Sequence, residues 1–165
     1  MRVYLPATFP GLRALLETGE VGEPPLPGYA VTGELTEWYA EGDQEELEYV
    51  AMTLAARASV RLLDADPDAV RRRVVVVAEV PDASVQRVPH VDRAAVKVTS
   101  AVRLKDVHAV HVDDLAAVPD VTVAADAVVE ADLGSRDAVF RLEQADGHEL
   151  AWYATQEIGA LVELG

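Results

Sequence analysis

The sequence predicts an α+β fold, a mixed β-sheet of about five or six strands packed against helices, in a single globular domain over residues 1–165. Three observations carry this prediction. The stretch 43–63 has the periodicity of an amphipathic helix. Short apolar runs typical of strands recur on both sides of it. Half of the 165 residues are hydrophobic, which provides for one core and argues against disorder.

The predicted long helix, 43–63, begins with a capping signal. The Asp43 side chain can accept a hydrogen bond from the backbone N–H of Glu46, and Glu46 can reach back to the N–H of Asp43. Two apolar stripes predict two neighbours, a sheet and a second helix, or alternatively a subunit interface on the second stripe. The first stripe is Leu47, Ala51, Leu54, Ala58 and Leu62, and the second is Tyr49, Met52, Ala56, Val60 and Leu63.

The elements before this helix are short. Thr8 is a typical helix cap and Gly19 a typical helix end. In order, we expect a strand at 1–6, a helix at 8–18, an extended Pro/Gly connection at 19–28, a strand at 29–32 and a helical turn at 33–42.

The most apolar strand is predicted at 70–80, where VVVVAEV indicates burial on both faces and hence a central position. The arginines before it, Arg71 to Arg73, are expected to pair with the acidic surface nearby, or alternatively to bind an anion. Further strands are expected at 84–88, 94–99, 107–112 and 138–142, and 114–133 is expected to be a helix, although its β-branched residues leave a strand open.

The C-terminal segment repeats the capping pattern of the long helix. Asp146 and Glu149 match Asp43 and Glu46, so a helix is expected over 146–164. A hairpin turn at Asp146-Gly147 is the alternative. The match leads to a hypothesis of two pseudo-symmetric β-α-β-α halves, 1–63 and 107–164, against the alternative that the match is a coincidence.

Composition limits the partners and the location. The formal net charge of −15 disfavours direct binding to nucleic acid or to anionic membranes, and it leaves a basic protein, a metal cation or a cationic ligand as partners. No stretch approaches the length of a membrane helix. The absence of cysteine excludes disulfides and thiolate metal sites, and it suits the reducing cytoplasm, where we expect the protein.

Two Trp-Tyr pairs are the candidate binding residues. Trp38 and Tyr39 lie in an acidic stretch with Glu41, and Trp152 and Tyr153 lie near the C-terminus. If the protein binds a small molecule, both pairs should converge on one deep cavity. The alternative is that the aromatic rings complete the core while the acids are solvated.

No catalytic residue, metal site or cofactor is predicted. His108 and His111 are the nearest approach to a metal motif, but their odd spacing on a strand should point them to opposite faces. The chain has no Gly-x-Ser-x-Gly elbow and no Gly-rich phosphate loop.

Four segments, MRVYLPAT, PPLPGYAVT, EWYAEGDQEELEYVA and HELAWYATQE, together resemble a family of small acidic actinobacterial proteins without an assigned activity. The resemblance covers nearly the whole chain. It implies a bacterial, intracellular, single-domain protein, and it implies no activity, cofactor or site residue.

Three functions are compatible with these features. The first is a non-catalytic module for protein interaction or regulation, with a homodimer through the second stripe of the long helix. The second is a small-molecule-binding protein or enzyme with a pocket of Trp, Tyr and carboxylate side chains. The third is an acidic antagonist that occupies the nucleic-acid site of a basic protein.

Overall fold

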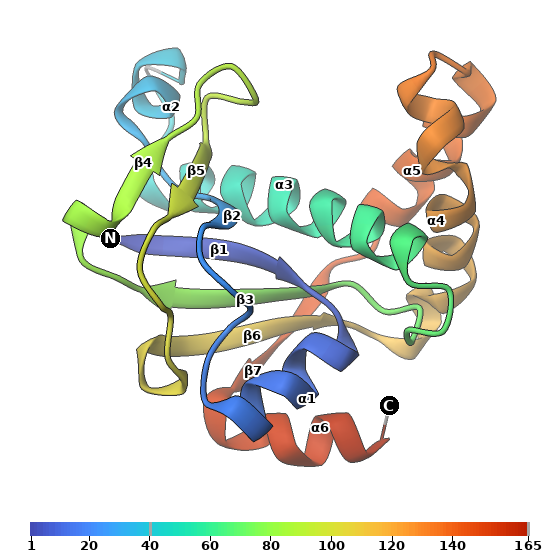
Figure 1. Cartoon of the computed structure of the whole chain (residues 1–165). Helices are drawn as coiled ribbons and strands as arrows, with labels where there is room; N and C mark the ends of the chain where they lie inside the picture. Colours follow the sequence, from blue (N-terminus) through green and yellow to red (C-terminus); the bar gives the residue numbers. More distant parts are fainter. Residues whose placement is uncertain (40, 165) are drawn as a thin grey trace.

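The computed structural model describes residues 1–39 and 41–164, and it is an α+β fold, as predicted. A sheet with the strand order β4-β5-β2-β1-β3-β6-β7, slightly more strands than expected, carries helices on both faces (Figure 1). Every strand pairing is antiparallel. The strands are β1 (Arg2–Ala7), β2 (Leu26–Tyr29), β3 (Val74–Glu79), β4 (Val85–Arg87), β5 (Ala95–Val98), β6 (Val107–Asp113) and β7 (Leu150–Ala154); the helices are α1 (Phe9–Thr18), α2 (Gly33–Trp38), α3 (Gln44–Ala65), α4 (Val118–Asp132), α5 (Arg136–Asp146) and α6 (Ile158–Leu164).

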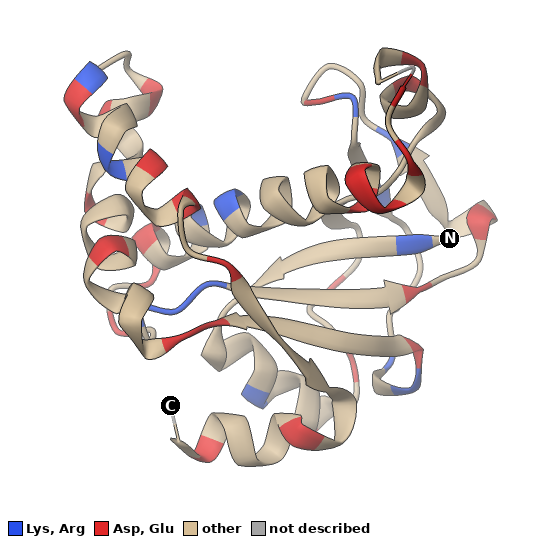
Figure 2. Cartoon of the chain, turned by 180° about the vertical axis from the view of Figure 1, so that it is seen from behind, with Lys and Arg blue, Asp and Glu red and all other residues tan. Residues whose placement is uncertain are grey.

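Strand β3 lies inside the sheet between β1 and β6, as its apolar run predicts. Val74 to Ala78 are all buried, because helices cover both faces at this point. Helices α1 and α6 pack on one face around Phe9, Leu12 and Ile158. Helix α3 packs on the other face (Figures 1 and 2), where Ala51, Ala55 and Ala56 contact Tyr4, Val75 and Val77.

Helix α3 has the two neighbours that its stripes predict. Its middle lies on β1 and β3, and its C-terminal half packs Val60 and Leu63 against Val121 and Ala124 of α4. The subunit interface proposed for the second stripe is wrong for most of its length, because Ala56, Val60 and Leu63 are buried within the chain. Tyr49 remains exposed at the start of that stripe.

The prediction of a helix over 146–164 is wrong for its first part, and only Ile158–Leu164 is an α-helix, α6. The expected strand 138–142 lies within α5, which Ser135 caps by accepting a hydrogen bond from the N–H of Ala138. Asp146 is the last residue of α5, and Leu150–Ala154 is a strand because it pairs along β6. Neither a continuous helix nor a hairpin from 138–142 forms. The matched segments differ in structure, because Asp43 caps α3 whereas Asp146 ends α5 and is followed by β7, so this match gives no support to two pseudo-symmetric halves.

Other boundaries need smaller corrections. The expected helix at 114–133 is confirmed as α4 over Val118–Asp132. The second strand begins at Leu26 rather than Tyr29, inside the predicted Pro/Gly connection, because Leu26–Tyr29 pairs with β5. Gly28 is needed there, since an added Cβ would lie 2.8 Å from Leu5 Cδ2 and 3.0 Å from the Tyr4 carbonyl oxygen. In the described residues, no helix combines the length and the apolarity that crossing a bilayer requires.

Candidate functional site

Helix α3 covers only part of its face of the sheet, and a cavity of about 500 Å³ lies beside it, bounded by β6 and β7. We call this the α3–β7 cleft. Strands β1 and β3 contribute side chains to it, and the α5–β7 connection contributes others. The lining residues are Arg2, Tyr4, Glu45, Glu48, Tyr49, Met52, Thr53, Ala56, Arg73, Val77, His108, His111, Asp146, His148, Glu149, Leu150 and Trp152.

One side of α3 forms a wall of the cleft. Glu45, Glu48, Tyr49, Met52 and Thr53 recur at the three- and four-residue spacing that places side chains on one helix face. The Asp43 carboxylate caps the helix at 2.8 Å from the N–H of Glu46, as predicted, and so holds this first turn in place. Carboxylates therefore line the cleft at the start of α3, where acidic residues gather (Figure 2).

A β-bulge in β6 gives the opposite wall two histidines. Val77 of β3 pairs with Ala109, but the next residue, Ala78, pairs with Val107, so His108 is an extra residue in the ladder. The bulge changes the alternation of side chains, and His108 and His111 both line the cleft. The expectation that they point to opposite faces is therefore wrong.

His111 is held toward its neutral form. Burial lowers the pKa of its imidazole below the ordinary value of 6.5, and the nearby His108 adds to the effect, while the Leu150 backbone acts in the opposite direction. At pH 7 His111 is a neutral imidazole, which can both donate and accept a hydrogen bond.

Tyr4 contributes a neutral phenol from β1. Its side chain is 4% exposed, and burial raises its pKa to about 12, with the charge of Glu48 adding and that of Arg2 opposing. Arg2 itself donates from Nε to Glu79 Oε1 at 2.9 Å, and this hydrogen bond raises the pKa of its guanidinium. The sequence did not distinguish Tyr4 from an ordinary strand residue.

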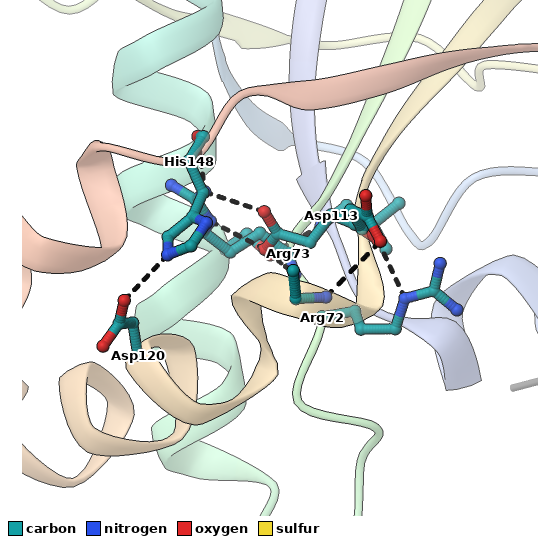
Figure 3. A network of polar contacts seen from close by, with 9 residues as sticks. Arg72, Arg73, Asp113, Asp120 and His148 are labelled. Atoms are coloured by element: carbon teal, nitrogen blue, oxygen red, sulfur yellow. Dashed lines mark hydrogen bonds and ion pairs between the residues drawn. The ribbon is translucent and has the colours of Figure 1, made fainter.

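A buried ion pair lies at the α5 end of the cleft (Figure 3). Arg73 is 2% exposed and Asp113 is fully buried. Arg73 donates to both carboxylate oxygens of Asp113, from Nε at 2.8 Å and from Nη2 at 2.8 Å. Arg73 Nη2 also donates to the carbonyl of His148 at 3.0 Å, which attaches the α5–β7 connection to β3.

The same network reaches α4 through His148. Its Nε2 lies 2.7 Å from Asp120 Oδ2, so the ring links the start of α4 to the cleft (Figure 3). Arg72 donates to the Asp113 carbonyl at 2.9 Å, and its guanidinium lies 5.1 Å from the centre of the Phe9 ring. Arg72 and Arg73 are thus buried and bonded inside the protein. They neither form an anion site nor pair with the acidic surface.

The two predicted Trp-Tyr pairs do not converge. Trp152 lines the α3–β7 cleft, but Tyr153 points to the other face of the sheet and packs against the core there. Trp38 lines a separate hollow with Glu34, Glu37 and Asp92. The prediction of one cavity shared by both pairs is therefore wrong.

A cationic side chain of the protein, Arg93, already stacks on Trp38 in the predicted acidic site. The guanidinium of Arg93 lies 3.5 Å from the centre of the Trp38 ring. Tyr39 and Glu41 are exposed next to this contact and do not line the same hollow. Of the five candidate residues, only Trp152 belongs to the α3–β7 cleft.

The His and Glu side chains of the cleft do not form a metal-binding cluster in the described residues. Across residues 1–39 and 41–164, no three His, Cys, Asp or Glu side chains are arranged to hold a metal ion. The functional groups that line the cleft are two exposed aromatic rings, carboxylates, imidazoles and a buried phenol. These groups suit the binding of an organic molecule by stacking and hydrogen bonding.

Comparison with curated proteins and with solved structures finds no significant match. A model of a family of unknown function, DUF6912, matches residues 1–162, nearly the whole chain, and the protein therefore belongs to this family.

Proposed function

We propose that the protein binds a small organic ligand in the α3–β7 cleft. The observation that carries the proposal is a pair of exposed aromatic rings from the two walls of one cavity. Tyr49 of α3 is 59% exposed and Trp152 of β7 is 57% exposed, and both line the cleft. A flat or apolar ligand between them would remove both rings from water.

The surroundings of the rings support this proposal. The cavity of about 500 Å³ lies within the range of small-molecule sites, about 300 to 1,000 Å³. Polar groups reach it from several strands and a helix, which gives the directional contacts that select one ligand. Tyr4 and His111 are held by the sheet, so these groups are positioned before a ligand arrives.

Ligand-observed NMR with a library of aromatic fragments tests the proposal. We expect fragments that bind the wild-type protein and lose binding in the double variant Tyr49→Ala/Trp152→Ala. Trp38→Ala is the matched control, because Trp38 is equally exposed but lines a different hollow. A screen without hits, or hits that persist in the double variant, would show that the cleft is not a ligand site.

A second candidate is the protein-interaction module expected from the sequence. The observation that favours it is a set of exposed apolar side chains on the α4–α5 hairpin: Val129, Leu133, Val139 and Phe140. Such surfaces are typical of protein contacts, here assigned to a homodimer. Light scattering at several concentrations tests it: a dimer abolished by Phe140→Asp supports this role, and a monomer throughout excludes it.

A further inference from the structure

We propose that the ligand of the α3–β7 cleft is an organic cation, an amine or a quaternary ammonium compound with a flat apolar body. This inference rests on the proposed function and specifies its ligand class. Three features of the cleft support it: the charges that line it, its neutral polar groups and its exposed aromatic rings.

The positive charges that line the cleft are already neutralised by the protein. Arg73 forms its bidentate ion pair with Asp113, with a closest distance of 2.8 Å. Arg2 is paired with Glu79 at 2.9 Å. Each of these positive charges is therefore matched by a carboxylate of the protein, so the two arginines give the cleft no surplus of positive charge.

Three carboxylates that line the cleft are not neutralised in this way. Glu45, Glu48 and Glu149 line the cleft, and none of them forms an ion pair within residues 1–39 and 41–164. Glu48 accepts only a long hydrogen bond, 3.3 Å, from the uncharged amide of Gln44. The cleft thus has a surplus of carboxylates, which attracts a cation and repels an anion.

The other polar groups of the cleft are compatible with a cation. His111 is neutral at pH 7, because burial lowers its pKa, and its ring can accept a hydrogen bond from an ammonium N–H without repelling the charge. Tyr4 is buried and uncharged, since its pKa is raised to about 12, and its hydroxyl can also accept such a bond.

The aromatic rings provide the second, independent argument. A cation is stabilised over the face of a Trp or Tyr ring. Elsewhere in the chain this interaction is satisfied internally, since Arg93 lies over Trp38. In the part of the chain that the structure describes, no cationic side chain stacks on Trp152, although its ring is exposed and lines the same cleft as Glu45 and Glu48.

Tryptophan fluorescence tests the charge preference directly, because the chain has only two tryptophans. In a Trp38→Phe background, Trp152 is the single reporter and lies in the cleft. The probes are benzylamine, benzyl alcohol and phenylacetate, which share a ring and differ in charge. We expect benzylamine to bind at least about tenfold more tightly than benzyl alcohol, and phenylacetate to bind most weakly.

Charge-removing variants in the same background locate the effect. Glu45→Gln/Glu48→Gln should weaken benzylamine binding about tenfold and leave benzyl alcohol binding unchanged, because only the ammonium group uses the carboxylates. Glu41→Gln/Glu46→Gln is the matched control: it likewise removes two carboxylates close to the start of α3, but neither residue lines the cleft.

The outcomes separate this inference from the proposed function. Equal binding of all three probes, or benzylamine binding that survives in the double variant, would overturn the cation inference while ligand binding stands. Fragment hits by NMR that are confined to neutral or anionic compounds would overturn it too. A fragment screen without any hit would contradict both the proposed ligand-binding function and the cation inference.

Discussion

Single residues of the cleft acquire their protonation states from burial. Tyr4 and His111 are shifted in opposite directions, because burial disfavours the charged form of each: the phenolate of tyrosine and the imidazolium of histidine. Both side chains are consequently uncharged at pH 7. Their shared neutrality keeps the interior end of the cleft free of net charge, while Glu45 and Glu48 carry charge at its helical wall.

Tyr4 predicts a loss of stability at alkaline pH. Its folded-state pKa of about 12 lies above the ordinary value of 10.0, so between these values the unfolded chain releases a proton that the folded chain retains. The free energy of unfolding therefore falls as the pH rises, by about 1.4 kcal/mol at pH 11 from this group alone. Urea unfolding at pH 8 and pH 11 should show that Tyr4→Phe loses less stability than the wild type.

Tyr49→Phe is the control for this measurement, since Tyr49 is largely exposed and its replacement should retain the pH dependence of the wild type. If Tyr4→Phe and the wild type lose stability in parallel up to pH 11, the phenol of Tyr4 is not the group that titrates late.

The ion pair of Arg73 and Asp113 predicts a large effect of a single substitution. Asp113→Ala leaves a buried guanidinium without its partner, which should lower the free energy of unfolding by about 3–5 kcal/mol. Replacing both residues, Arg73→Met/Asp113→Leu, should recover much of this loss. Chemical denaturation measures both variants.

The control for the buried pair is an exposed one. Arg57 pairs with Asp146 at 2.8 Å, but its side chain is 58% exposed, so Arg57→Ala should lower the unfolding free energy by only about 0–1 kcal/mol. Similar losses in Asp113→Ala and Arg57→Ala would contradict the assignment of Arg73 and Asp113 as a buried structural pair.

At the scale of elements, α3 connects the parts of the molecule. It packs on the sheet through small alanines, on α4 through Val60 and Leu63, and it forms one wall of the cleft. Ser59 fixes its position on the sheet: Oγ donates to the Ala7 carbonyl at 2.7 Å and accepts from the Val74 N–H at 3.1 Å. A fully buried serine in the middle of a helix thus joins α3 to β1 and β3.

Removal of the Ser59 hydroxyl is therefore expected to destabilise the fold. Ser59→Ala removes two buried hydrogen bonds to backbone groups that also pair with each other in the β1–β3 ladder, which should lower the free energy of unfolding by about 0.5–1.5 kcal/mol. Ser100→Ala, in the loop after β5, is the matched control and should leave the urea midpoint unchanged. An unchanged midpoint for Ser59→Ala would show that the β1–β3 pairing alone satisfies these backbone groups and that the Ser59 hydroxyl contributes nothing measurable.

At the scale of the whole molecule, charge opposes compaction. The net charge of −15 in 165 residues makes long-range repulsion between carboxylates a general cost of the folded state. Exposed ion pairs such as Arg61 with Asp132 offset only a small part of it. The repulsion acts over the Debye length, which shortens from about 30 Å at 0.01 M salt to about 3 Å at 1 M.

Added NaCl should therefore stabilise the protein, although it weakens individual surface ion pairs. Differential scanning calorimetry should show a rise in Tm of about 2–4 °C between low and high salt, which corresponds to about 1 kcal/mol. Sucrose at matched osmolality is a control without ionic screening. A Tm that falls with salt would indicate that the ion pairs outweigh the net repulsion.

The fold was predictable where a local pattern and its tertiary context agree. Helix α3 begins with the cap predicted at Asp43, and β3 is buried as its apolar run requires. A helix was predicted at Leu150–Ala154 from its periodicity, but the segment is a strand because it pairs with β6. For the cleft, the exposed Trp152 was found from the sequence, whereas His108 was expected on the opposite face from His111, because the bulge in β6 has no local signature.

The sequence by itself determined the α+β class, the long capped helix, the interior strand and the acidic character. These properties follow from periodicity, capping and composition, which act over a few residues or over the whole chain at once. Only the tertiary structure decided which side chains share a site. Tyr4, His108, Tyr49 and Trp152 come from four separate elements, and they meet because strand register, a bulge and the position of α3 on the sheet bring together residues that are far apart in the chain.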